Sequence, residues 1–497
     1  MNAKLVVAVA FAVMTGVSAQ ERGRPAERER ALSMFARSYF PGRSGQIMIV
    51  PREGATVISK RDPVVQFMHG SPWPYDTKIP LLLYGPPYIR AGTHTRAARQ
   101  QDVMPAVAGL VGMPIPPTVT GRPLTEAIER STVPPRVVVI AVLDGMRLDY
   151  FDRYAEVIPT LSRLRRTGAW FPNTSIDYLP SITSLGHATV STGTDPRYHG
   201  TTGNSLFDRV SLKPQDAFAG NNPRDLMVLN VADMWNLHTR GRAVIVVQGS
   251  SGPAAVGLAG HGACLFGAAP IRMASYNRQS GEWTSNATCY HLPDYVKQRK
   301  ARDLWESVGG TWLGHPVANA DSIRRTSVFA RFEADTLLSM IEGESVGVDD
   351  VTDLVIVNFK TPDFVGHQYG PESPEVREAL AELDRQLARV VDVLDKKTER
   401  RYVIAITADH GMPGEPPAPS LRIQSDDVIK LVHDHFDPQG LLVQHYEPEN
   451  SQISIDMNRL AALDKTLADV ARLLEKQPFI FAAFTEDEVR AKASEIP

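Results

Sequence analysis

The 497-residue chain has little cysteine and no excess of positive charge. Its two cysteines, Cys264 and Cys289, are too few for a zinc finger or a disulfide-stapled small domain. Whether they pair, as an oxidising compartment would allow, stays open. The 53 Lys and Arg residues against 56 Asp and Glu give a net charge of −3, which disfavours nucleic-acid binding through bulk charge. The 43% of hydrophobic residues excludes a disordered chain.

Long apolar runs are also missing, so we expect no transmembrane helix in the mature protein. Residues 1–19 contain the positive Lys4, an apolar run over residues 5–14 and the small residues Val-Ser-Ala at their end. This pattern is typical of a signal peptide cleaved after Ala19. No cysteine follows that could carry a lipid. We therefore expect a periplasmic or secreted protein; the alternative is a buried N-terminal helix.

The chain contains five short apolar runs: Ile79–Tyr84, Val137–Leu143, Ala243–Val247, Leu354–Phe359 and Tyr402–Thr407. Each run is continuous rather than alternating, which predicts strands buried on both faces of a parallel sheet. Helical spacing of apolar residues appears at 158–167 and 374–396. This order predicts an α/β fold with a central, mostly parallel sheet and helices on both faces. Residues 249–315, rich in Gly, Ser and aromatics, are expected to form a small inserted cap.

Metal-ligating residue types follow three of these strands: Asp144, then Asp363 with His367, then Asp409 with His410. Ligands of open α/β sheets bind beyond the carboxyl ends of the strands. Carboxylate and imidazole without thiolate suit Zn²⁺ or another divalent ion. A single Asp after a strand is usually a turn or capping residue, but three such strand ends favour a two-metal site.

Thr183 is the candidate nucleophile. It lies in residues 180–189 (PSITSLGHAT), just before a predicted helix that starts near Ser184. A hydroxyl at a helix N-terminus lies in positive potential, and coordination to a metal would lower its pKa further. The alternatives are that Thr183 only caps the helix, or that Ser184 is the reactive hydroxyl.

Seven motifs form a set at characteristic spacings: Asp144-Gly145, Thr183-x-x-Gly186-His187, Thr192-Gly193, His199-Gly200, Gly203-Asn204, Asp363-x-x-x-His367 and Ala408-Asp409-His410-Gly411. This set, over about residues 136–411, resembles the alkaline phosphatase superfamily, in particular the type I phosphodiesterase/nucleotide pyrophosphatases and the bacterial alkaline phosphatases with a threonine nucleophile. The resemblance implies two Zn²⁺ ions and a phosphothreonine intermediate. It assigns one ion to Asp144, Thr183, Asp409 and His410, the other to Asp363 and His367, and a phosphoryl oxygen to Asn204 with the Thr183 N–H.

The chain departs from this family in the ligand that completes the second site. The family places a histidine in a His-Gly-Ser-Pro setting well after the Asp-His-Gly motif, whereas here the later candidates are His433, His435 and His445. The expected setting occurs instead near the front, at residues 68–76 (MHGSPWPYD). We therefore predict a circular permutation in which His69 completes the second site. The alternative is a gene-model or fusion artefact with His445 or His435 as ligand.

The resulting organisation is a signal peptide (1–19), a permuted segment (20–135), a core part with the nucleophile (136–248), the cap (249–315) and a core part with metal ligands (316–497). Ser251 and Pro253 stand where the threonine-dependent alkaline phosphatases have a Lys-x-Arg pair. Losing two charge-assisted contacts, at roughly 1.5–3 kcal/mol each, disfavours a phosphomonoester dianion. Nearby cations that could substitute are Arg209, Lys213 and Arg272.

We therefore predict an exported phosphodiesterase or nucleotide pyrophosphatase whose partner is a small phosphoester or nucleotide. The alternatives are an alkaline phosphatase and a catalytically inactive zinc-binding module of the cell envelope. A sulfatase is disfavoured, because Thr183-Ser184-Leu185-Gly186-His187 lacks the Cys/Ser-x-Pro-x-Arg context of the modified nucleophile.

Overall fold

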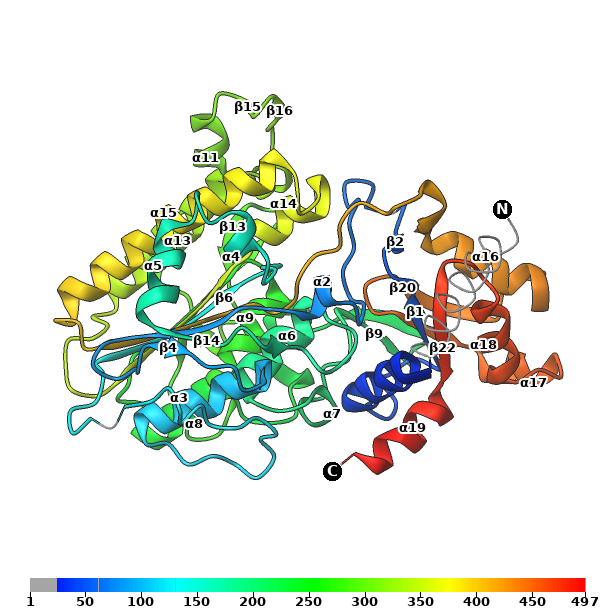
Figure 1. The fold of residues 1–497 in the computed structure, drawn as a ribbon, viewed down its shortest axis with the longest axis horizontal. Coiled ribbons are helices and arrows are strands. Elements are labelled where there is room, and N and C mark those ends of the chain that lie inside the picture. Colours follow the sequence, from blue (N-terminus) through cyan, green and yellow to red (C-terminus); the bar gives the residue numbers. More distant parts are fainter. Residues whose placement is uncertain (1–24, 61, 130, 497) are drawn as a thin grey trace, which may run out of the picture.

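The computed structural model describes residues 25–496 except residues 61 and 130, so the predicted signal peptide lies outside the described residues. A ten-stranded sheet and a four-stranded sheet lie side by side (Figure 1). The larger sheet has the order β13-β12-β11-β17-β6-β18-β3-β7-β4, with β14 beside β12. Its strands are β3 (Leu81–Tyr84), β4 (Gly92–Thr93), β6 (Val137–Leu143), β7 (Ala169–Trp170), β11 (Ile245–Gly249), β12 (Ile271–Asn277), β13 (Glu282–Thr284), β14 (Tyr290–His291), β17 (Asp353–Phe359) and β18 (Tyr402–Thr407).

The centre of this sheet is parallel, since β12, β11, β17, β6 and β18 all run in one direction. The predicted α/β fold with a mostly parallel central sheet is therefore confirmed. The run at 79–84 is the exception, because β3 pairs antiparallel with β18. The chain reaches β3 from the carboxyl end of β18, where Gly411 N donates to Asp76 O at 2.8 Å. From that end, β3 can only run back against β18.

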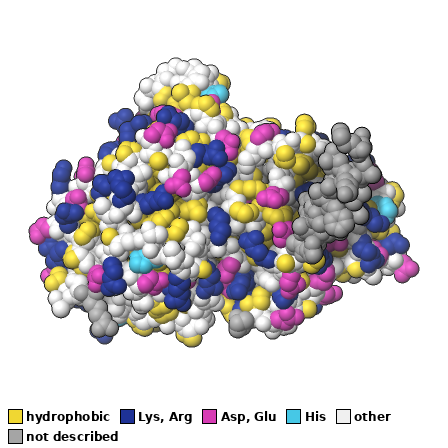
Figure 2. Space-filling view, viewed as in Figure 1, with side chains coloured by type: hydrophobic (Ala, Val, Ile, Leu, Met, Phe, Trp, Pro, Cys, Tyr) yellow, Lys and Arg dark blue, Asp and Glu magenta, His cyan; other side chains and the backbone are white. Residues whose placement is uncertain are grey.

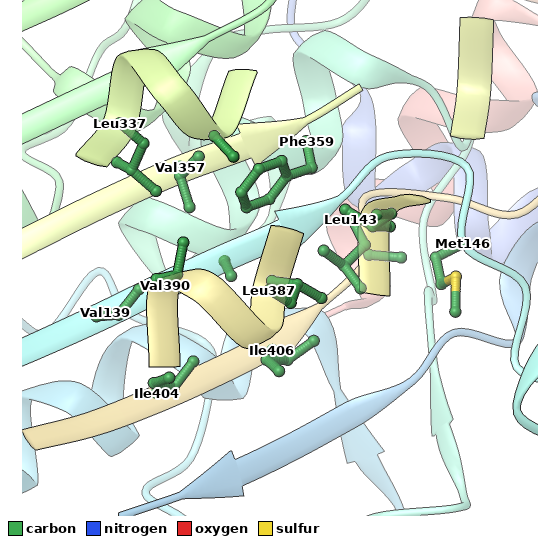
Figure 3. Packing of buried hydrophobic residues seen from close by; sticks show 14 of the residues in the cluster. Val139, Leu143, Met146, Leu337, Val357, Phe359, Leu387, Val390, Ile404 and Ile406 are labelled. Atoms are coloured by element: carbon green, nitrogen blue, oxygen red, sulfur yellow. The ribbon is translucent and has the colours of Figure 1, made fainter. Parts of the chain in front are cut away.

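Alternate side chains of β6 enter two separate cores, as expected for a strand buried on both faces. One face of β6 carries Val137, Val139, Ala141 and Leu143. It packs under α5 (Pro159–Thr167), α13 (Val328–Gly343) and α15 (Pro374–Lys397). Figure 3 shows this packing, with Leu387 and Val390 of α15 above Val139, Ile404 and Ile406. The other face packs on α3 (Val103–Val111), α6 (Thr183–Thr192), α8 (Val231–Thr239) and α9 (Gly252–Ala259).

The two helices predicted from apolar spacing are present as α5 and α15, each within one residue of the expected range. The start of α15 follows from local chemistry: the Ser373 side chain accepts from Val376 N, and Pro374 occupies the first turn, where no N–H is needed. Lys396 and Lys397 complement the negative end of the helix dipole in its last turn.

The smaller sheet joins the two ends of the described chain. Its order is β20-β21-β1-β22, and every pair is antiparallel. Strand β1 (Ile47–Pro51) lies between β21 (Gln452–Ile455) and β22 (Ile480–Thr485), and β20 (Val443–Glu447) forms an edge. Helices α16 (Ser425–Phe436) and α18 (Leu467–Glu475) pack on one face. The helix over residues 25–38 and α19 (Glu486–Glu495) pack on the other (Figure 1).

Residues 249–315 differ from the expected inserted cap, because β12, β13 and β14 within this range extend the central sheet. Only α11 (Ala301–Ser307), β15 (Thr311–Trp312) and β16 (His315–Pro316) project from the body (Figure 1). Cys264 and Cys289 form a disulfide within this range. Among the described residues, no helix combines the length and apolar character that crossing a membrane requires. Figure 2 shows both charge signs interspersed on the visible face, in line with the near-neutral composition.

Candidate metal centre and active site

Three buried aspartates meet where the central strands end. Asp144 directly follows β6, Asp409 lies two residues after β18, and Asp363 is in the first turn of α14 (Thr361–Tyr369), which follows β17. All three side chains are essentially inaccessible to solvent. Because β6 lies between β17 and β18, the strand order brings the three carboxylates to one edge of the sheet. Three buried acids at one place require compensating cations.

The histidines of the site share one orientation. In each, Nδ1 lies against a backbone carbonyl oxygen, which can only accept, so Nδ1 carries the proton and Nε2 faces the carboxylates. The Nδ1–oxygen pairs are His69 with Ser181 at 3.0 Å, His367 with Phe67 at 2.6 Å and His410 with Gly411 at 2.8 Å. This orientation presents three Nε2 atoms as ligands for a metal.

The first cluster surrounds the imidazole of His410. Its Nε2 lies 3.4 Å from Asp144 Oδ1, 3.4 Å from Thr183 Oγ1 and 3.1 Å from Asp409 Oδ2. Ligand atoms at about 2.0–2.1 Å from a tetrahedral zinc ion are about 3.3–3.4 Å apart. Asp409 Oδ2 is buried and accepts no aligned hydrogen bond from the described residues. The donor set and its spacing fit a divalent ion.

The second cluster contains His69, as the sequence predicted. Asp363 Oδ1 lies 3.2 Å from His367 Nε2 and 3.7 Å from His69 Nε2. The His69 ring also stacks on the His410 ring at 3.4 Å between centroids. Asp363 Oδ1 is another buried oxygen without an aligned hydrogen bond from the described part of the chain. His69, Asp363 and His410 offer ligand atoms that all lie within 4.8 Å of one another, which fits a divalent ion, and His367 lies beside Asp363 as a further candidate ligand.

The alternative ligands have partners elsewhere. Nε2 of His433 accepts from Val443 N, the His435 ring contacts Phe436, and the His445 ring stacks on Phe207. His187 Nε2 lies 3.7 Å from Asp144 Oδ2 and His187 Nδ1 lies 3.4 Å from Asp409 Oδ2, so these three side chains form a candidate metal-binding group. The same Nδ1 donates to Thr183 O. His187 therefore braces the start of α6 beside the first cluster.

Burial and mutual charge shift the pKa values of the cluster. Burial, followed by the Asp409 charge, raises the pKa of Asp144 well above its ordinary value. Burial, followed by His410 and His367, lowers the pKa of His69, which keeps this imidazole neutral and able to coordinate. Burial lowers the pKa of His410, but the Asp409 carboxylate outweighs it and raises the value to about 10.

Thr183 occupies the first turn of α6, and the N-cap position belongs to Ile182, so Thr183 is not the cap. Its hydroxyl points into the cluster, whereas Ser184 Oγ is buried and finds no hydrogen-bond partner among the described residues. Asn204 lies at the same helix end, where its Oδ1 accepts from Ser184 N at 2.9 Å. The predicted nucleophile and the predicted phosphoryl-binding amide are thus neighbours.

Sequence reasoning missed three side chains at this site. Lys360 contacts Asp144, Asp363 and Thr183 through its ammonium group. Glu333 on α13 accepts from Lys360 N at 2.7 Å and holds the turn after β17. Burial raises the pKa of Glu449, which receives a hydrogen bond from the Asn204 side chain. Of these three residues, only Lys360 could have been suspected from the sequence, because it is a cation directly after a buried strand and three residues before Asp363.

Gly186 permits the close approach of α6 to the first cluster. A Cβ there would lie 2.6 Å from Asp409 Cβ and 2.7 Å from Asp409 O. We expect Gly186→Ala to displace Asp409 and, on the metal-binding role predicted for Asp409, to lower kcat/KM by about 10- to 100-fold with a loss of bound metal. Gly414→Ala is the control, because its Cβ would meet no atom within 4 Å. A Gly186→Ala protein with unchanged kinetics and metal content would contradict this packing argument.

A family model for type I phosphodiesterase/nucleotide pyrophosphatase matches residues 137–492. The chain belongs to this family. It is 26% identical over 452 residues to alkaline phosphatase PafA of Elizabethkingia meningoseptica, covering 76% of this chain and 80% of that protein. It is 26% identical over 394 residues to alkaline phosphatase PhoV of Synechococcus elongatus, covering 68% and 70%.

The fold comparison agrees with the family. The crystal structure of wild-type PafA matches with a TM-score of 0.58 at 23% identity, over 70% of this chain and 78% of that chain. The expected superfamily is thereby confirmed, and the chain is a hydrolase of phosphoric ester bonds.

Proposed function

We propose that this member of the type I phosphodiesterase/nucleotide pyrophosphatase family is an exported, two-metal phosphodiesterase that acts through a phosphothreonine intermediate. The observation that supports this proposal most directly is that His69 and the strand-end acids lie together beside the Thr183 hydroxyl. Asp144, Thr183, Asp409 and His410 would hold one zinc ion, and His69, Asp363 and His367 the other. The ions would lower the pKa of Thr183 and neutralise the leaving oxygen.

The chain's own residues account for the remaining steps. Thr183 Oγ1 forms a bond to phosphorus while the bond to the leaving-group oxygen breaks, and water later cleaves the phosphothreonine to restore the hydroxyl. The Thr183 N–H in the first turn of α6 and the Asn204 side-chain amide lie beside the Thr183 hydroxyl, where they would bind a non-bridging oxygen.

The two positions without cations support a diester preference. Ser251 is the N-cap of α9, where its side chain accepts from Ala254 N, and Pro253 lies in the first turn. The three cations that we considered as substitutes pair with other residues or are exposed to solvent. Arg209 pairs with Glu486, Arg272 pairs with Glu344, and Lys213 is exposed on β10 (Lys213–Asp216).

Kinetics on two aryl esters test the proposal. We expect a higher kcat/KM for bis(4-nitrophenyl) phosphate than for 4-nitrophenyl phosphate, because the monoester carries an additional charge to neutralise. A chelator should abolish turnover of both, and Zn²⁺ should restore it. A ratio that favours the monoester would support an alkaline phosphatase instead. Bound metal without turnover of any ester would support the inactive zinc-binding module.

The export and the permutation belong to the same proposal. The disulfide between Cys264 and Cys289 is suited to an oxidising compartment, in line with the predicted signal peptide.

The family match begins at residue 137, after the segment that supplies His69 and β3. A family C-terminal segment moved to the front of the chain would explain why the match begins only at residue 137 and why His69 lies before it. Such a move need not disturb the packing, because domain termini are often close together at the surface.

A further inference from the structure

Lys360 is a cation buried inside the acidic cluster. It directly follows β17 and is 6% exposed. Its Nζ lies 2.8 Å from Asp144 Oδ1 and 2.8 Å from Asp363 Oδ2, and it donates to Thr183 Oγ1 at 3.1 Å. One ammonium group therefore touches a proposed ligand of each metal ion and the nucleophile.

The surroundings fix this side chain in place. The backbone N of Lys360 donates to Glu333 Oε1 at 2.7 Å, and Glu333 also receives hydrogen bonds from Ser250 and Thr361. The Phe364 ring lies with its centroid 5.4 Å from Nζ. The ammonium is thus held by a packed and hydrogen-bonded turn, so the fold itself fixes its position beside Thr183.

Geometry places this ammonium within reach of a bound phosphoryl group. A phosphorus atom poised for attack lies about 3–3.5 Å from the attacking oxygen. Since Nζ is 3.1 Å from that oxygen, a non-bridging phosphoryl oxygen can lie within hydrogen-bond distance of it. Within the described part of the chain, the recorded ion pairs of Asp144, Asp363 and Asp409 involve histidines and Lys360 but no other Lys or Arg.

We propose that Lys360 is the substrate-binding cation of this site, donating to a non-bridging phosphoryl oxygen in place of the cations absent at Ser251 and Pro253. This inference rests on the proposed function. An ammonium has three donors, so it can keep a contact with Asp144 or Asp363 while it binds the phosphoryl group. A single cation in place of two suits a monoanionic diester better than a dianionic monoester.

The test uses Lys360→Met and Lys360→Arg in the metal-loaded protein. The control is Lys300→Met, which removes a half-exposed lysine paired with Glu282. Binding of inorganic phosphate is measured by calorimetry, metal content by elemental analysis, and kcat/KM on both aryl esters. We expect Lys360→Met to keep its metal and to weaken phosphate binding and kcat/KM by about 10- to 100-fold, the value of one charge-assisted contact. Lys360→Arg should fall between Lys360→Met and the wild type, and Lys300→Met should match the wild type.

Two outcomes would overturn the inference. One is wild-type phosphate affinity in metal-saturated Lys360→Met, which would reduce Lys360 to a neutralising partner of the aspartates. The other is a loss of binding that follows the loss of metal and disappears when the metal is restored. Phosphate calorimetry needs no turnover, so it tests Lys360 even if the wild-type protein hydrolyses neither ester and the proposed function itself fails.

Discussion

Thr183→Ala is expected to lower kcat/KM on an aryl phosphodiester by at least about 10⁴-fold, because removing a nucleophile abolishes the covalent route. The substitution removes the hydroxyl and the γ-methyl group of one residue, and Asp144, Asp409 and His410 would still hold the metal. Metal content should therefore fall much less than activity. Steady-state kinetics and elemental analysis of the same sample measure both quantities.

The neighbouring hydroxyl provides the matched control. Ser184 Oγ is buried one residue away but makes no hydrogen bond within the described residues. We expect Ser184→Ala to keep kcat/KM within a few-fold of the wild type. Acid quenching with a ³²P-labelled substrate should trap the label on Thr183 in the wild type and in Ser184→Ala. Full turnover by Thr183→Ala, or label on another residue, would refute the proposed nucleophile.

His69→Ala is expected to remove one of two bound metal ions and to lower kcat/KM by at least about 100-fold. Losing only an indirect support of a metal ligand already costs about 10- to 100-fold, and His69 would itself be a ligand. Its Nε2 lies 3.7 Å from Asp363 Oδ1, and His69, Asp363 and His410 offer ligand atoms within 4.8 Å of one another. Metal stoichiometry is the decisive measurement.

A histidine at the other end of the sequence tests the specificity of this effect. His435 is exposed on α16, where its ring contacts Phe436. We expect His435→Ala to keep both ions and the wild-type rate. Retention of two ions by His69→Ala would remove the N-terminal segment from the metal centre, and the permutation would then lose its functional support.

Much of the fold could be predicted from local pattern. The runs at 137–143 and 402–407 are buried on both faces, so nothing polar interrupts them, and their bounds match β6 and β18. Strand direction was not predictable in this way. The run at 79–84 has the same composition, yet β3 is antiparallel because of the route that the chain takes past Gly411. Composition likewise could not show that β12 joins the central sheet.

The functional site, like the fold, could be predicted only in part from the sequence. The strand-end acids and histidines were proposed from their residue types and from the family resemblance, and His69 from the resemblance of residues 68–76 alone. The structure places all seven predicted metal-site residues near one another. Lys360 and Glu449 were missed because a lysine or glutamate in a loop is ordinarily a solvated charge. Their roles depend on contacts between segments far apart in the sequence, Lys360 with Asp144 and Glu449 with Asn204.

The central place of β1 in the smaller sheet has a consequence for how the chain matures. One of the first strands to be synthesised receives its two neighbours only after residues 452–485 have been made. The histidine at position 69 likewise waits for Asp363. Ribosomal synthesis at about 5–20 residues per second leaves the early segment without its partners for many seconds. The proposed metal site can therefore form only after residues 363–410 have been made, late in synthesis.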